Sequence, residues 1–252
     1  MNIRAISVGV AGAAALLLTS VSAQAATVLS FGAASAPGNV GWLNAGSGGT
    51  FSTGTYTAPS SDTIQVQLIN LFVGDTADVA STFTLDGVAP SGNAASAFGA
   101  HIFQDGIGGG SPGSFSIIAA TAFVYHSHLY LAGTNVLSGT FDSGEIAGEK
   151  GGSLGSLSSV TAADVTFTSA IGLPISSISA DNNFVLDLAS IKPSLSASAG
   201  MALNSFNATA AGQFVSAVVP EPATWGLMFM GFGAMGAMIR SSRRKQRLAV
   251  TA

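Results

Sequence analysis

The sequence contains no cysteine and few charges. Of its 252 residues, eight are Lys or Arg and twelve are Asp or Glu. Without cysteine the chain forms neither a disulfide nor a thiolate metal site. Its stability must therefore come from packing, hydrogen bonds or an oxygen-liganded ion, and the absence of cysteine does not exclude export.

The few charges are unevenly distributed along the chain. Residues 27–219 carry eleven acidic side chains against two basic ones, Lys150 and Lys192, which gives a net charge of about −9. An acidic surface repels phosphate backbones, so the composition disfavours nucleic-acid binding. Five of the remaining basic residues gather at the C-terminus: Arg240, Arg243, Arg244, Lys245 and Arg247.

The N-terminus has the three parts of a secretion signal. Arg4 precedes an apolar run over residues 5–18, and Ala23-Gln24-Ala25 follows it. One positive charge, a short apolar run and a small-x-small ending are typical of a signal peptide. We predict a signal peptide over residues 1–25, cut by signal peptidase after Ala23-Gln24-Ala25. The alternatives are a buried first helix or a retained anchor, but the run is short for a membrane span.

A second uncharged segment covers residues 223–239. At about 1.5 Å per residue a helix of this length reaches about 25 Å, the short end of a membrane span. Trp225 lies at its outer end, where an indole ring favours the membrane interface. The basic cluster that follows predicts a stop-transfer signal whose end stays in the cytoplasm. We therefore predict a single C-terminal transmembrane helix in the inner membrane, with the preceding domain outside the cytoplasm.

Three features occur in a fixed order at this end of the chain. Pro220-Glu221-Pro222 is followed by Trp225, then by an apolar span containing Gly231-Phe232-Gly233, then by the basic cluster. This arrangement resembles the PEP-CTERM sorting signal, in the variant with Trp after the proline motif. The resemblance covers residues 218–248. It implies that an exosortase-type membrane protease recognises Pro220, Glu221 and Pro222 and processes the chain nearby.

The segment between the two ends has the pattern of a β domain. No helix-length amphipathic pattern occurs there, whereas short Val-, Ile-, Thr- and Phe-rich stretches recur between Gly, Ser, Asn and Asp clusters. Ile64, Val66 and Leu68 alternate with polar residues, as do Phe184, Leu186 and Leu188, which is typical of half-buried strands. We expect strands within residues 63–72, 81–85, 114–125, 129–132, 165–168, 183–188 and 213–218.

These stretches predict a mainly β fold, an antiparallel β-sandwich or jelly-roll-like domain over residues 26–219. The Gly- and Ser-rich segments 99–113 and 144–159 are expected to be surface loops. The Ala-rich segment 197–212 fits either a short helix or another strand.

Candidate metal ligands are few. His126 and His128, two apart in a strand-like run, would share one face and could bind a metal, although such a pair more often forms a solvated polar face. Asp75, Asp78 and Asp86 flank a turn and the strand at 81–85, and oxygen-rich loops of this kind can hold calcium. The segment matches no complete calcium loop, and hydrogen bonds within the turn are the simpler reading. We predict no metal and no cofactor.

The sequence offers little for catalysis. It contains no Gly-x-Ser-x-Gly elbow, no His-Glu-x-x-His and no phosphate-binding loop. Glu145 and Glu149 could serve as paired carboxylates for glycoside hydrolysis, but they lie in a Gly-rich stretch without aromatic neighbours to hold a sugar. We expect no enzymatic activity.

The sequence as a whole predicts an exported cell-surface or exopolysaccharide-matrix protein, sorted through residues 220–248. One alternative is an exported polysaccharide-acting hydrolase delivered by the same tail, and another is a permanently anchored single-pass surface protein. A cleft with converging acids and aromatic rings would favour the hydrolase. A closed fold with scattered acids would favour the structural role.

Overall fold

The structure is a computed structural model that describes residues 25–32, 38–59, 62–69, 76–160, 164–178 and 181–217. The predicted signal peptide, apart from Ala25, and the whole predicted sorting segment lie outside these residues. Among the described residues no helix is long and apolar enough to cross a membrane. The span at 223–239 therefore stays a prediction from the sequence.

The described chain is mainly β and forms seventeen strands. They are β1 Ala25–Phe31, β2 Val40–Asn44, β3 Gly49–Thr55, β4 Ala58–Pro59, β5 Asp62–Ile69, β6 Thr76–Ala89, β7 Ser96–Phe98, β8 His101–Ile107, β9 Gly113–Ala119, β10 Phe123–Tyr125, β11 His128–Tyr130, β12 Asn135–Phe141, β13 Gly144–Glu149, β14 Gly155–Ser159, β15 Val165–Thr168, β16 Asn182–Lys192 and β17 Phe206–Ala217.

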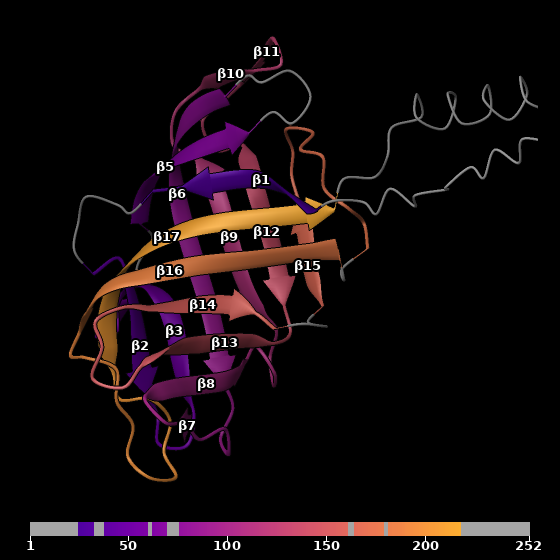
Figure 1. The fold of residues 1–252 in the computed structure, drawn as a ribbon. Helices are drawn as coiled ribbons and strands as arrows, with labels where there is room; N and C mark the ends of the chain where they lie inside the picture. The colour runs from indigo at the N-terminus through magenta and orange to yellow at the C-terminus, as the bar shows by residue number, and fades with distance from the viewer. Residues whose placement is uncertain are drawn as a thin grey trace, which may run out of the picture.

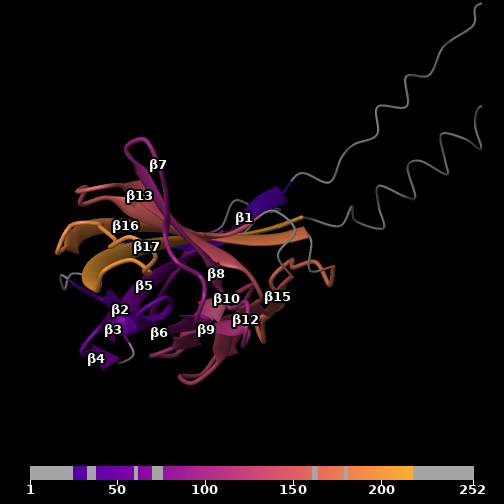
Figure 2. The same cartoon turned by 90° about the horizontal axis from the view of Figure 1, so that it is seen from below.

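The strands lie in two layers that face each other (Figure 1, Figure 2). The front layer in Figure 1 holds β8, β13, β14, β16 and β17, with β1 beside β17. Behind it, β6, β9 and β12 run across the front strands at a steep angle. Strands β10 and β11 form a separate small hairpin.

Six strands link the two layers into a closed ring. In ring order these are β6, β3, β2, β17, β1 and β5, and β5 pairs again with β6, every pairing being antiparallel. The long strands make this possible, because β17 pairs with β2 near its start and with β1 near its end. The predicted β class is confirmed, but the sandwich is not: the described strands of both layers belong to one continuous sheet.

The alternating pattern seen in the sequence decides which side chains face the core. In β16, Phe184, Leu186 and Leu188 are buried while Asn183 and Asp187 are exposed. In β5, Val66 and Leu68 are buried and Gln67 between them is exposed. Successive side chains on a strand point to opposite faces, so this register puts every second residue between the layers. Each of the seven predicted stretches overlaps a strand, and residues 206–212 of the Ala-rich segment begin β17 rather than a helix.

The two segments predicted as surface loops contain strands instead. Residues 99–113 hold β8, and residues 144–159 hold β13 and β14. Ile146 and Leu157 are fully buried and pair across β13 and β14. The paired glycines Gly148 and Gly155 lack side chains, which leaves room for Leu195 beneath them. Here glycine marks close packing against the core and not a turn.

A cluster of seven phenylalanine rings joins the two layers. The front layer supplies Phe31, Phe184 and Phe214, and the back layer supplies Phe83, Phe115, Phe141 and Phe167. Phe214 contacts four of the other rings, and its centroid lies 4.8 Å from that of Phe115. Gly212 makes space in the same strand, since a Cβ there would collide with the Phe31 ring. The cluster is therefore fitted closely around β17.

We expect Phe214→Ala to lower the free energy of unfolding by about 3–5 kcal/mol, because it leaves a cavity among four rings. Phe98→Ala is the matched control. Phe98 is 83% exposed, and its loss should change the free energy by less than about 0.5 kcal/mol. Urea titration followed by intrinsic fluorescence measures both. Equal effects of the two changes would show that the cluster does not hold the layers together.

Candidate functional site

The first and last described strands bring the two ends of the domain together. Strand β1 pairs with β17 so that Ala25 lies opposite Ala217 and Ala26 opposite Ser216. The predicted signal peptide thus joins the domain beside the point where the sorting segment begins. Ala23, the motif residues and the basic cluster lie outside the described residues: Pro220, Glu221, Pro222, Trp225, Arg240, Arg243, Arg244, Lys245 and Arg247. Their roles stay predictions.

A buried polar network holds the end of β17 in place. The Ser216 hydroxyl donates to Oδ1 of Asn182 at 2.7 Å and accepts from the backbone N–H of Ser176 at 2.7 Å. Asn182 in turn donates from Nδ2 to the carbonyl oxygens of Val165 and Ser176. The Ser176 hydroxyl donates to the Asp181 carboxylate at 2.8 Å. Because buried polar groups are costly without partners, this network fixes the strand that leads into the sorting segment.

The outer face of the front layer carries an interacting pair of carboxyl groups. Glu145 in β13 and Asp105 in β8 meet at a bulge, where the register shifts between Gly144 and Ile146. Gly106, with φ of 73°, supplies the left-handed residue of this bulge. Burial, then a hydrogen bond with Asp105, then the negative charge of Asp105 raise the pKa of Glu145 to about 7. A carboxyl group with this pKa is partly protonated near neutral pH.

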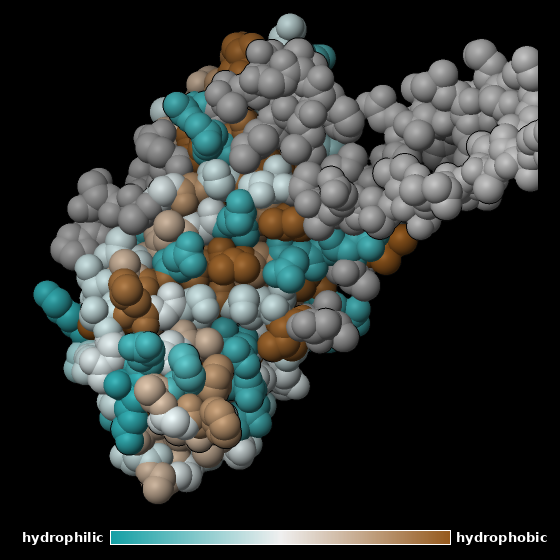
Figure 3. All heavy atoms as spheres, in the orientation of Figure 1, coloured by the Kyte–Doolittle hydropathy of each residue, from teal (hydrophilic) through white to brown (hydrophobic). Residues whose placement is uncertain are grey.

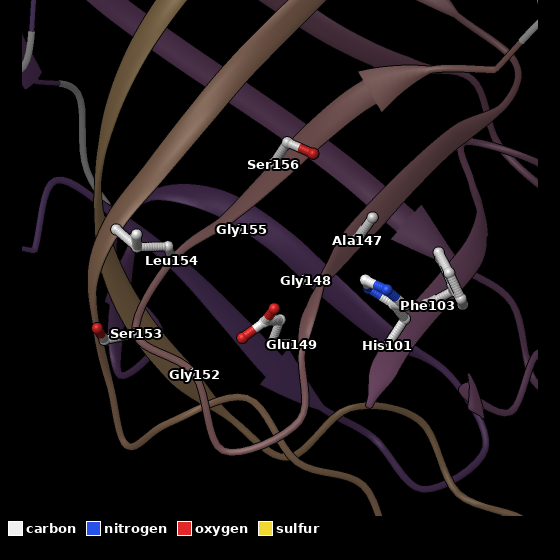
Figure 4. Close-up of a pocket in the computed structure, with 10 residues that line it drawn as sticks. All are labelled: His101, Phe103, Ala147, Gly148, Glu149, Gly152, Ser153, Leu154, Gly155 and Ser156. Atoms are coloured by element: carbon white, nitrogen blue, oxygen red, sulfur yellow. The ribbon is translucent and has the colours of Figure 1, made fainter. Parts of the chain in front are cut away.

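An open groove with a volume of about 690 Å³ lies on the same face, where the turn between β13 and β14 approaches β8 (Figure 4). His101 and Phe103 project from β8, and their ring centroids lie 6.3 Å apart. Leu154 and Ser153 come from the turn, and Glu149 lies between the turn and β8. Ala147 and Ser156, which pair across β13 and β14, are small and leave the groove hollow.

The surrounding face is mainly hydrophilic, with separate hydrophobic spots (Figure 3). Glu145 and Glu149 both lie on β13, four residues apart, so they are about 13 Å from each other along the strand. They do not form a pair, and each meets residues of β8 instead. The expectation that no aromatic ring lies near them is wrong, because β8 places Phe103 and His101 beside Glu149.

The predicted metal ligands are not brought together. His126 lies in the turn between β10 and β11 with φ of 49° and stacks on Tyr125, whereas His128 begins β11. The two histidines are therefore not neighbours on one strand face. Asp78 and Asp86 lie in the same strand, β6, eight residues or about 26 Å apart, instead of flanking a turn. Asp75 lies outside the described residues, among which no group of three metal-ligating side chains occurs.

The groove residues lie in the Gly- and Ser-rich segments 99–113 and 144–159, whose composition predicts surface loops and gives no signal for β8, β13 and β14. The run His101-Ile102-Phe103-Gln104-Asp105 alternates between the outer face and the interior. Gln104 interrupted the apolar pattern, yet it is buried and hydrogen-bonded: its side chain donates to the carbonyl of Asn93 and accepts from the N–H of Leu203. A strand that contains a buried, hydrogen-bonded polar residue can be recognised only when the hydrogen-bond partners of that residue are known.

Comparison with known proteins identifies the C-terminal segment. The family model of the PEP-CTERM protein-sorting motif matches residues 218–245. No curated protein and no solved structure matches the chain. The sequence resemblance to this sorting signal is thereby confirmed, and it begins one residue after the last described residue of β17.

We expect Ser216→Ala to destabilise the fold by about 1–3 kcal/mol, because it leaves the Ser176 N–H and the Asn182 carboxamide oxygen buried without a partner. Gln213→Ala is the control on the same strand. Gln213 is exposed and donates one surface hydrogen bond to Thr27. Thermal unfolding compares the two, and a Ser216 variant as stable as the control would contradict the anchoring role.

The Glu145 pair predicts a loss of stability as the pH rises. Because the folded-state pKa of about 7 lies above the ordinary value of 4.5, the folded chain holds this proton more tightly than the unfolded chain. The contribution is complete below the ordinary pKa and is lost as pH rises through about 7. With solvent screening, we expect a fall of about 1 kcal/mol. Glu145→Gln should remove this fall in the free energy of unfolding, whereas Glu149→Gln should not. Urea titrations at a series of pH values that spans both pKa values measure the difference between the variants.

Proposed function

Because the chain carries a PEP-CTERM protein-sorting motif, which indicates sorting by an exosortase-type system, we propose the following course. Signal peptidase removes residues 1–25, and the segment 223–239 holds the precursor in the inner membrane with the β domain outside. An exosortase-type protease then cuts near Pro220-Glu221-Pro222. The mature domain stays at the cell surface or in the exopolysaccharide matrix. The observation that carries this proposal is the motif match at residues 218–245.

The chemistry of the motif suits recognition by a membrane protease. Two prolines remove backbone N–H donors and favour an extended chain. Glu221 between them supplies one negative charge that a protease can recognise. Strand β17 ends at Ala217, so Pro220 lies within about 10 Å of the strand end by chain length alone. The protease would therefore work close to a folded domain whose last strand is firmly anchored.

The domain itself is proposed to act as a structural or binding module. Its core is continuous between the two layers, and its acids are spread along several strands. The hydrolase alternative has two observations in its favour: the raised pKa of Glu145, since a general acid works best with a pKa near the operating pH, and the rings of Phe103 and His101 beside Glu149. The carboxyl groups of Glu145 and Asp105 are hydrogen-bonded to each other, however. The two carboxyl groups of a glycosidase are instead about 5–10 Å apart, with the scissile bond between them.

Processing in the native host tests the sorting proposal. We expect intact mass spectrometry of the mature wild-type protein to give an N-terminus at Ala26 or Thr27 and to lack the residues after the cleavage point. Glu221→Ala or Pro222→Ala should leave export intact and block C-terminal processing, so a heavier product with the apolar span accumulates. Glu149→Ala, which removes one acid from the domain, should be processed normally.

Deleting residues 240–247 should act differently from the motif variants. Without the basic cluster the short apolar span is a marginal stop signal, so more protein should pass fully across the membrane. A wild-type protein that keeps its C-terminus, unchanged in mass and location by the Glu221 and Pro222 variants, would show that the segment is a permanent anchor.

A further inference from the structure

We propose that the groove between β8 and the turn joining β13 to β14 binds a non-acidic glycan, one made of neutral or amino-bearing pyranoses. The volume of about 690 Å³ falls within the usual range of small-molecule sites, about 300–1,000 Å³. It is open at the surface, so a chain longer than the groove can pass through it. This ligand assignment rests on the proposed delivery outside the cytoplasm, but binding can be measured separately from sorting.

Aromatic rings supply the apolar side of the site. Phe103 and His101 project from β8 into the groove, with their rings tilted by 33° to each other. Phe98 lies opposite His101 in β7 and is 83% exposed. A pyranose presents C–H groups on its faces, which pack on aromatic rings, while its hydroxyls point outward. A row of aromatic side chains along an open groove therefore suits a sugar chain better than a compact apolar ligand, which needs an enclosed pocket.

Polar groups on the other side of the groove can meet sugar hydroxyls. The Glu149 carboxylate accepts hydrogen bonds, and the hydroxyls of Ser153 and Ser156 can both donate and accept. Ala147, which lies opposite Ser156 on β13, is too small to block access. Hydrogen bonds to a charged acceptor are the stronger kind, so Glu149 is expected to orient the ligand.

The turn that forms one wall is held by backbone hydrogen bonds before any ligand binds. Lys150 donates to the carbonyl of Ala100 at 2.7 Å, and Gly151 donates to that of Leu195 at 2.7 Å. The carbonyl of Ser153 accepts from the N–H of Ile191 at 3.0 Å. A wall fixed in this way loses little conformational freedom on binding, which is the main requirement for affinity at a shallow site.

Charge selects among glycans. Asp105, Glu145, Glu149 and Asp187 occupy outward positions on adjacent strands of this face. Of the two basic side chains in residues 27–219, Lys150 follows Glu149 in the turn and Lys192 ends β16. Neither of them lines the groove, where Glu149 supplies a negative charge. A uronic-acid polymer would meet like charge, whereas an amino sugar would be attracted. A protein partner is less favoured, because the floor of the groove consists of small residues that give a protein side chain little to pack against.

Glycan binding by the full-length chain in detergent tests the proposal. Calorimetric titration with cellohexaose, a glucosamine hexamer and a galacturonate hexamer should show binding of the first two and none of the third. Phe103→Ala should weaken binding about tenfold, as expected for an aromatic anchor. Leu154→Ala should also weaken it, whereas Leu129→Ala should not; the two leucines are 66% and 64% exposed, and only Leu154 lines the groove.

Glu149→Gln gives a readout that misfolding would not produce. It should reduce the preference for the glucosamine hexamer over cellohexaose while cellohexaose binding persists. Absence of binding to both, equal binding of the galacturonate hexamer, or equal effects of Leu154→Ala and Leu129→Ala would overturn the proposal. So would a change of oligomeric state in Leu154→Ala, which would mark the groove as a protein interface. Normal C-terminal processing alongside failed binding would leave the sorting proposal intact.

Discussion

The packing of phenylalanine rings between two crossed layers is the interaction on which the rest of this structure depends. Neither layer can bury its inner face alone, because an isolated sheet leaves one apolar surface in water. Phe214 lies at the centre of the cluster and belongs to β17, the strand that pairs with β1, β2 and β16. Offset and edge-on ring pairs add about 0.5–1.5 kcal/mol each beyond their buried area. β17 is also one of the six strands of the closed ring, and its pairing with β1 places both ends of the domain side by side.

The same strand couples the core to the sorting signal. The hydrogen bonds of Ser216 with Asn182 and Ser176 hold this strand in place near its end. Ser216 lies four residues before Pro220 in the sequence. On its other side Ala25 and Ala26 pair with Ala217 and Ser216. A domain whose two ends leave at one point can lose both processing segments without losing any core residue, since Phe214 is the last of the cluster. Processing as proposed at both ends would therefore leave the packed core intact.

Many of the strands and the sorting motif can be predicted from the sequence. The strands and the groove that it does not predict have physical reasons for escaping prediction. The alternation of Phe184, Leu186 and Leu188 locates a strand because one face is core and the other is water. The motif at Pro220-Glu221-Pro222 is local in sequence and was found for that reason. The sequence does not predict β13 and β14, because Gly148 and Gly155 resemble turn residues. Leu195, whose side chain fills the space beside them, lies at least 40 residues further along the chain. Ring closure and the groove depend on such distant partners and have no local signal.

The front layer places the exit of the chain and the groove at opposite ends of β16. Strand β16 begins at Asn182, which bonds to Ser216 near the exit of the chain. Its other end lies at the groove, where Ile191 bonds to Ser153 in the turn. Nine residues of extended strand place these points about 30 Å apart. A domain held at the membrane by the segment after β17 would therefore keep its exit toward the bilayer and its groove away from it. A groove beside the exit would be covered by the membrane or the protease during processing. With the groove at the far end of β16, the proposed ligand would have access to it both before and after removal of the proposed anchor.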